Sequence, residues 1–413
     1  MDTITHGIAG ALIAKAVFNG DEMFALRPMN ARRVVTWSLM TGAIFPDCDT
    51  LRDFFSHNEL LMITWHHSIT HSLVCLPIFA LLLAALTRAA CRYFRWEAPA
   101  FAALAGIYTV GILSHIFLDL VTTFGTMIWS PLGWSRPAWD LIFIVDFTFT
   151  ALMLLQQWLA WVYATREKWK PRALGIWLVS ELGLMVVAAI AQIVGAPISA
   201  QNIVLASLVL TLMVFLPARH FWGAHVSLAA WNRAGLLAAC LYLALATYTH
   251  HVALERIKTF AAFLHLEVQS IGALPLPPST WQWDGLIRTP EGVYDWRMDL
   301  GQKSPITATA AAGATSPSTS HSGDADEPPL KYSFYPDAFP NAFIERAREL
   351  PEVKKVLWFS RFPVTQFHKE GVDAVVEISD KRFPQIRPDR PAAFTYRVRF
   401  GSSGQVVSQG WER

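Results

Sequence analysis

The chain has 413 residues, of which 53% are hydrophobic and only 16% are charged. Soluble globular proteins carry about 25% charged residues, so the composition excludes a disordered chain and argues against a soluble globule. The 34 Lys and Arg residues against 32 Asp and Glu leave a formal charge of +2, so we expect no nucleic-acid partner.

Apolar segments dominate the first 250 residues. Six of them approach or exceed the roughly 20 residues that a helix needs to cross a bilayer: 72–90, 99–121, 138–163, 173–195, 200–217 and 234–250. Two shorter segments, 4–18 and 34–45, precede them, and the second reaches only about 18 Å at 1.5 Å per residue. This pair either crosses the membrane or forms a half-buried hairpin. We therefore expect residues 1–250 to form an all-α polytopic membrane bundle of about eight segments.

Basic residues predict the orientation of this bundle, because loops on the cytoplasmic side carry an excess of Lys and Arg. One set of alternate loops holds twelve: Arg27, Arg32, Arg33, Arg88, Arg92, Arg95, Arg166, Lys168, Lys170, Arg172, Arg219 and Arg233. The other set holds only Arg52 and Arg136. We expect a multi-pass protein of the bacterial inner membrane, with the N-terminus and the C-terminal domain in the periplasm.

The composition changes after residue 250. Residues 251–280 suggest an amphipathic membrane-surface helix at 254–266 and a proline-rich linker at 272–279. Residues 281–413 suggest a small soluble α+β domain, interrupted by a low-complexity, disordered insertion at about 303–330. Within it we expect strands in 281–300, a helix at 342–350, and strands at 353–360, 372–378 and 393–400.

Histidine and aspartate residues gather in the first 120 residues. Six of the thirteen histidines occur there: His6, His57, His66, His67, His71 and His115. Residues four apart share a helix face, which pairs Asp2 with His6, His67 with His71, and His115 with Asp119. Asp47 and Asp49 form a separate PDCD turn. Imidazole and carboxylate together suit zinc, manganese or iron.

The predicted topology puts all these groups at the same end of the bundle, because they open or close four successive segments. A lone histidine at a helix end is more often an interfacial or capping residue, and Asp47 or Asp49 alone is common in a turn. His115 and Asp119 are more informative, because ionisable groups at membrane depth are costly and tend to mark function. Together the four pieces predict one metal site at the outer mouth.

The motifs MDxxTHG, PDxD, HxxxTHS and SHxxxD, with Gly125-Thr126 and the IVDF of residues 144–147 downstream, resemble the YdjM-like membrane-bound metal-dependent hydrolases. The resemblance is clear over residues 1–150. It implies metal and catalytic positions at His6, Asp47, Asp49, His66, His71, His115 and Asp119. His67 departs from the family pattern, which often has Arg there, so that position binds either an anion or a metal.

A ring of seven or more such groups exceeds the ligand set of one metal, so we expect one or two ions, zinc first with manganese as the alternative. Asp49 would bridge or act as general base, and His66 or His67 would protonate the leaving group. Asp2, Asp140 and Asp146 would orient ligands from a second layer. Asp140 as a helix N-terminal acid and Asp146 as part of an interhelical polar pair are equally good interpretations.

The expected activity is metal-dependent hydrolysis of an ester or phosphoester, in a lipid or lipid-linked substrate, by metal-activated water at the periplasmic membrane face. One alternative is a metal-ion binding or transport protein without hydrolytic activity. A second treats the membrane region as an anchor for a working C-terminal domain, with His368 and Glu370 as its candidate site residues.

Overall fold

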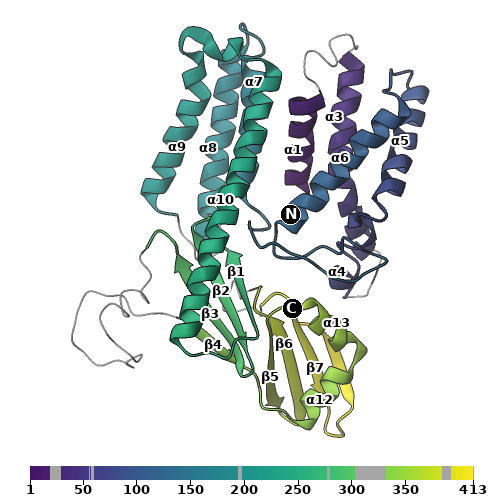
Figure 1. Ribbon diagram of the computed structural model, residues 1–413, viewed down its shortest axis with the longest axis vertical. Helices are drawn as coiled ribbons and strands as arrows, with labels where there is room; N and C mark the ends of the chain where they lie inside the picture. Colours follow the sequence, from purple (N-terminus) through teal and green to yellow (C-terminus); the bar gives the residue numbers. More distant parts are fainter. Residues whose placement is uncertain are drawn as a thin grey trace, which may run out of the picture.

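The computed structural model describes residues 1–18, 29–54, 56, 60–193, 198–276, 280–302, 332–383 and 392–412. Helices form one half of the molecule, and two antiparallel four-stranded sheets form the other (Figure 1). The N-terminus lies at the end of the helical half that faces the sheets (Figure 1). The insertion expected at about 303–330 falls outside the described residues.

The helical half begins with short helices. α1 (Thr3–Ile13) runs directly into the π-helical turn η1 (Ala14–Phe18), and α3 (Met29–Ile44) follows. The longer helices that follow are α5 (Leu76–Tyr93), α6 (Phe101–Leu120), α7 (Phe147–Tyr163), α8 (Trp169–Ile193), α9 (Ala200–Phe215) and α10 (Leu228–Phe263).

Five of the described helical segments are long and apolar enough to cross a membrane. They are α5, α6, α8, α10, and α9 with the turn η4 (Leu216–His225) that continues it. The expected count of about eight spans is not supported. α3 has 16 residues and α7 has 17, so α7 reaches only about 26 Å. The span expected at 138–163 is shortened because residues 138–146 are not helical and Asp146 caps α7.

Apolar side chains face outward from these helices. Only 11% of the apolar window of α8, and of the window of α9 with η4, is buried inside the protein. Leu178 and Leu182 on α8 and Val204 and Leu208 on α9 are more than half exposed. A large exposed apolar surface of this kind needs a partner, and a bilayer supplies one. The helical half therefore fits a membrane location.

Small residues bring α1, α3 and α6 into close contact. A Cβ atom added to Gly10 of α1 would lie 2.9 Å from Ala43 Cβ of α3. A Cβ added to Gly111 of α6 would lie 2.8 Å from Leu39 O of the same helix α3. Such close backbone approach is the usual reason for small residues between membrane helices. It places the N-terminus of α1, the C-terminus of α3 and the C-terminal turns of α6 next to one another.

α10 connects the two halves as one helix of 36 residues. Its first part packs in the bundle through Ala239 and Ala246. Its last part, including Ile257 and Phe260, covers the sheet formed by β1 (Ser270–Pro275), β2 (Gln282–Thr289), β3 (Gly292–Asp299) and β4 (Ser333–Pro336). The prediction of a separate membrane-surface helix at 254–266 is therefore wrong, since its apolar face packs on this sheet.

The second sheet has the order β5–β6–β7–β8 and is formed by Pro363–Glu370, Asp373–Asp380, Thr395–Phe400 and Val406–Trp411. α12 (Ala342–Glu349) and α13 (Pro351–Phe359) cover one of its faces. The prediction of a strand at 353–360 is wrong. Pro351 starts a helix there, and Val353, Val356 and Phe359 recur at helical spacing on its buried side.

Candidate metal centre

The candidate metal centre lies at the end of the bundle that faces the sheets. His6 is on α1, Asp47 and Asp49 are on the 3-10 helix η2 (Phe45–Phe54), and His115 and Asp119 are on the last turns of α6. Three further histidines come from the chain between α4 (Leu61–Thr64) and α5, which includes the turn η3 (Ile69–His71): His66, His67 and His71. His57 lies outside the described residues.

Three side chains form the tightest part of the centre. His71 Nε2 and His115 Nε2 are 3.0 Å apart. Asp119 Oδ2 is 3.2 Å from the first nitrogen and 3.0 Å from the second. Ligand atoms about 2.0–2.1 Å from a tetrahedral zinc ion lie about 3.3 Å from one another. The three atoms therefore have nearly the spacing of neighbouring ligands around one cation, and all three side chains are fully buried.

Further buried groups surround this trio. His115 Nε2 is 3.4 Å from Asp47 Oδ1, and His67 Nε2 is 3.6 Å from Asp119 Oδ2. The ring of His6 stacks on that of His115 with the centroids 3.7 Å apart. Three overlapping sets could hold an ion, each with its ligand atoms within 4.8 Å of one another: His6, Asp47 and His115; Asp47, His67 and His71; and His71, His115 and Asp119.

Oxygen atoms outside the cluster fix the imidazole tautomers. His115 Nδ1 donates to Ala43 O at 2.6 Å, and His67 Nδ1 donates to Gly125 O at 3.1 Å. Because a carbonyl oxygen can only accept, both rings carry the proton on Nδ1 when neutral and direct the Nε2 lone pair inward. His71 Nδ1 faces Thr70 Oγ1 at 3.0 Å and Asp49 Oδ2 at 3.4 Å, which sets the same tautomer. This is the arrangement by which outer partners orient metal-binding histidines.

The residues of the cluster fit a divalent cation. With the tautomers above, the inward atoms of His71, His115 and Asp119 are all acceptors, and close acceptors repel one another. Among the described residues, His6 Nδ1, His6 Nε2 and Asp119 Oδ2 are buried without a hydrogen-bond partner. Buried polar atoms are normally satisfied, and a bound cation would supply the partner that Asp119 Oδ2 and one nitrogen of His6 lack. The amino group of Met1 also contacts Asp119, through Oδ1. Mixed imidazole and carboxylate ligands suit zinc or manganese.

Asp49 and His66 lie just outside this cluster. Asp49 accepts hydrogen bonds from His66 Nδ1 at 2.8 Å, from the His67 amide at 3.2 Å and from Thr70 Oγ1 at 3.0 Å. Burial alone would raise the pKa of Asp49, but the hydrogen bonds from His66 and His71 outweigh it and hold this pKa well below its usual range. His66 is partly exposed at 16% of its side-chain area, so it reaches the edge of the centre.

The three carboxylates expected to orient ligands have other partners. Asp2 caps α1 by accepting from the Thr5 amide and hydroxyl. Asp146 caps α7 and accepts from Tyr242 of α10 at 2.7 Å, which makes it part of an interhelical pair. Asp140 accepts two hydrogen bonds from Arg361, which precedes β5, at 2.9 and 2.8 Å. The prediction that Asp140 and Asp146 orient metal ligands is therefore wrong, because their carboxylates bind Arg361 and Tyr242 rather than histidine.

The outer partners of the cluster include groups that we did not expect. Thr3 Oγ1 donates to Asp47 Oδ2 at 2.5 Å, and Thr70 links Asp49 to His71. Both threonines lie within the sequence motifs that contain the ligands, and this position could have indicated them as partners of the cluster. Ala43 and Gly125 act through backbone carbonyls, for which the residue type gives no signal.

Comparison with known families places this chain. A family model described as YdjM inner membrane protein matches residues 1–255, which is more than half of the sequence. The chain belongs to the YdjM inner membrane protein family. The YdjM segment contains the whole His/Asp cluster and ends within α10, so the sheets lie outside it. The comparisons with curated proteins and with solved structures found no match.

His368 and Glu370, the candidates of the anchor interpretation, lie far along the chain on β5. His368 Nε2 is 3.2 Å from Glu370 Oε1, and Glu370 also pairs with Arg397 and Arg399. The His368 side chain is 42% exposed. These residues form a solvated ion-pair network between β5 and β7 of the second sheet, in contrast to the buried cluster at the end of the bundle.

Proposed function

We propose that this YdjM-family protein is a membrane-bound, metal-dependent hydrolase. It would cleave an ester or phosphoester bond in a lipid or lipid-linked substrate at the periplasmic face of the inner membrane. The observation that carries the proposal is the convergence of His71 Nε2, His115 Nε2 and Asp119 Oδ2 within 3.2 Å of one another, with each imidazole held in the metal-binding tautomer.

Metal binding and proton transfer would fall to two different sets of residues. His71, His115 and Asp119, with His6, Asp47 and His67 around them, would hold one or two divalent ions, zinc first and manganese as the alternative. Such an ion polarises a carbonyl or phosphoryl oxygen and activates water. Asp49 and His66 form a second pair: Asp49 accepts from His66 Nδ1, which leaves Nε2 of this partly exposed side chain for proton transfer.

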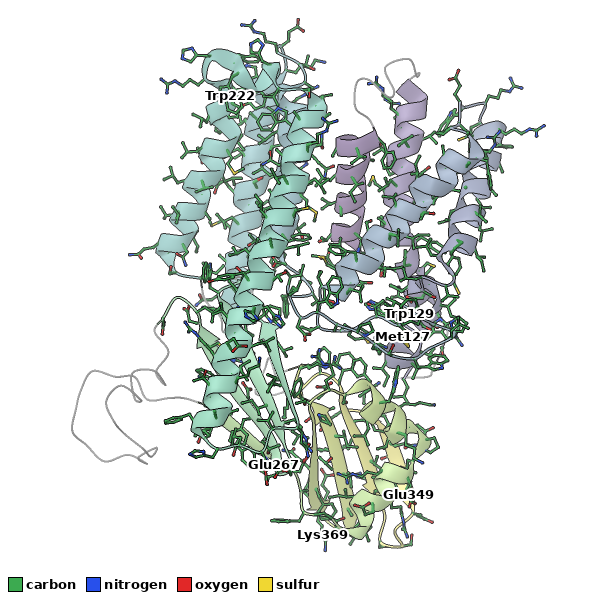
Figure 2. The ribbon with its side chains drawn as sticks, viewed as in Figure 1. Met127, Trp129, Trp222, Glu267, Glu349 and Lys369 are labelled. Atoms are coloured by element: carbon green, nitrogen blue, oxygen red, sulfur yellow. The ribbon has the colours of Figure 1, made fainter. Side chains whose placement is uncertain are left out.

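The position of the centre favours a substrate that resides in the membrane. The cluster lies at the end of the apolar helices, where lipid headgroups are the first molecules that it meets. Met127 and Trp129 lie at this end of the bundle and Trp222 lies at the other (Figure 2). Trp129, Trp134, Trp139 and Trp222 are each more than 40% exposed, as expected for the aromatic belts at both membrane surfaces.

The charge distribution supports a periplasmic centre. The connections at the opposite end of the bundle carry Arg95 between α5 and α6, Arg166 and Lys168 between α7 and α8, and Arg219 in η4. Basic connections of this kind stay in the cytoplasm. The end with the His/Asp cluster would therefore face the periplasm, together with the two sheets.

The test is hydrolysis of phospholipid vesicles and of a soluble phosphodiester by detergent-purified protein, with and without a chelator. We expect chelator-sensitive turnover that returns with added zinc or manganese. His66→Gln should lower kcat by about 10²–10⁴-fold, because it removes proton transfer, while the bound metal content stays at the parental value. Bound metal without turnover on any of these substrates would instead favour the binding and transport alternative.

A further inference from the structure

We infer that the C-terminal domain, formed by the two sheets with α12 and α13, supports the metal centre: it fixes residues 123–125 and thereby sets the position of His67. This inference rests on the proposed metal centre but concerns a part of the chain that lies outside the YdjM segment. The sheets lie directly next to the end of the bundle that carries the cluster (Figure 1).

Phe124 follows α6 and belongs to the hydrophobic core of the C-terminal domain. Its ring centroid lies 5.3 Å from that of Phe359 on α13 and 6.0 Å from that of Phe394. It is 5% exposed, and Leu60 and Ile63 from the bundle side join the same core. Removing this ring from the domain would leave a cavity in its core, so the contact is costly to break.

Arg382 holds the neighbouring residue. Its Nη1 group donates to Thr123 O at 2.9 Å. The same guanidinium donates from Nη2 to Phe359 O at 2.8 Å and from Nε to Asp380 Oδ2 at 2.8 Å. The C-terminal domain holds the planar guanidinium at two other points, so the direction of its Nη1 group is fixed. Arg382 can therefore orient the Thr123 carbonyl that it binds.

Gly125 links the segment 123–125 to His67 of the centre. Its carbonyl accepts from His67 Nδ1 at 3.1 Å and from Arg136 Nη2 at 3.0 Å. Arg136 in turn lies over the rings of Phe124 and Phe359, at 4.9 and 5.2 Å from their centroids. Gly125 has φ +84, and an added Cβ would lie 3.0 Å from Arg136 O, so glycine is required where the carbonyl turns toward His67.

His67 needs this support. Its backbone has φ 63, the left-handed region that non-glycine residues rarely adopt, and such conformations persist only where the surroundings impose them. The Met127 amide donates to His67 O at 2.8 Å, so the segment 125–127 binds both the main chain and the ring of His67. The ring then points Nε2 at Asp119 Oδ2, 3.6 Å away. Arg382, Phe124 and Arg136 are therefore positioning residues for this histidine.

The test compares Arg382→Gln with Arg361→Gln in the full-length protein. Both variants remove an arginine that joins the C-terminal domain to the bundle, but Arg361 binds Asp140, whereas Arg382 binds Thr123. Two readouts are taken: hydrogen–deuterium exchange of peptides covering 65–71 and 121–128 in metal-free protein, and the zinc dissociation constant by chelator competition. We expect faster exchange in both peptides and zinc binding weakened by about 10–100-fold for Arg382→Gln alone, the usual cost of losing an outer-layer partner.

Phe124→Ala attacks the same contact from the bundle side and should reproduce both changes, whereas Phe124→Leu keeps most of the apolar volume and should restore most of the protection. Parental exchange in both peptides for Arg382→Gln and Phe124→Ala would overturn the inference, as would an equal effect of Arg361→Gln. The exchange readout needs no metal. Failure of the parent to bind zinc would count against the proposed function, while the exchange rates would still decide the role of the domain.

Discussion

The imidazole rings of the centre are oriented by atoms that belong to the surrounding chain. His115 donates to a carbonyl of α3, His67 to the carbonyl of Gly125, and His71 faces Asp49 and Thr70. Each of these contacts leaves Nε2 as the inward atom. The ability of the centre to bind a cation would therefore depend on these outer partners as well as on the ligands themselves.

Asp49 contacts His66, the His67 amide and His71, so its substitution gives a direct prediction. Asp49→Asn should weaken zinc binding by about 10–100-fold, because the amide cannot balance the charge next to His71 or accept from His66 as a carboxylate does. The dissociation constant is measured by competition with a chromophoric chelator.

Asp2→Asn is the matched control for Asp49→Asn. It makes the same chemical change at a carboxylate that caps α1, and asparagine is an equally good cap. Its zinc dissociation constant should stay at the parental value. Equal weakening by the two variants would show that Asp49 has no special role.

The sequence predicted the inner residues better than their partners. Histidine and aspartate at helical spacing stand out in an apolar background, and His6, Asp47, His71, His115 and Asp119 do lie together. Asp140 and Asp146 looked equivalent in sequence, but their partners Arg361 and Tyr242 are distant along the chain. Local patterns identify which groups are costly to bury, while only the fold shows which group compensates for each.

Helix packing positions the ligands. α1 and α6 both approach α3 through glycine, so His6, Asp47 and His115 reach one point from three helices. Gly111 lies one turn before His115 on the face of α6 that contacts α3. Its replacement should therefore affect stability and the metal centre together.

Gly111→Ala should destabilise the protein by about 1–3 kcal/mol, the usual cost of overpacking, because the new Cβ would lie 2.8 Å from Leu39 O. Gly106→Ala on the same helix is the control, since nothing lies within 4 Å of its added Cβ and alanine is the better helix former. Thermal unfolding in detergent measures both. A lower unfolding temperature for Gly106→Ala than for Gly111→Ala would contradict this packing.

The length of the apolar segments predicted most helices, but not where the helices end or which elements they contact. Residues 138–163 are mostly apolar, yet α7 begins only at Phe147, because Asp146 caps it and the chain before it turns toward the C-terminal domain. Residues 353–360 read as a strand because of their Val and Phe content, yet Pro351 starts a helix there. β-branched and aromatic residues fit a buried helix face as well as a strand.

At the scale of the whole molecule, the C-terminal domain packs against the chain that follows α6 and lies next to the centre. The contacts between Phe124 and Phe359 and between Thr123 and Arg382 join residues more than 230 positions apart. No periodicity or motif indicates such pairs, so the sequence suggested two independent domains. The structure instead puts the sheets against the chain that holds His67, which makes removal of the whole C-terminal domain a poor test of where activity lies.

The central claim is that the buried His/Asp cluster holds a divalent cation. Elemental analysis of detergent-purified protein tests it most directly, with His115→Ala as the variant and His368→Ala, an exposed histidine of β5, as the control. We predict one or two zinc or manganese ions per chain in the parent and in His368→Ala, and a clear loss in His115→Ala. A parent without stoichiometric metal, or equal metal content in all three proteins, would contradict the claim.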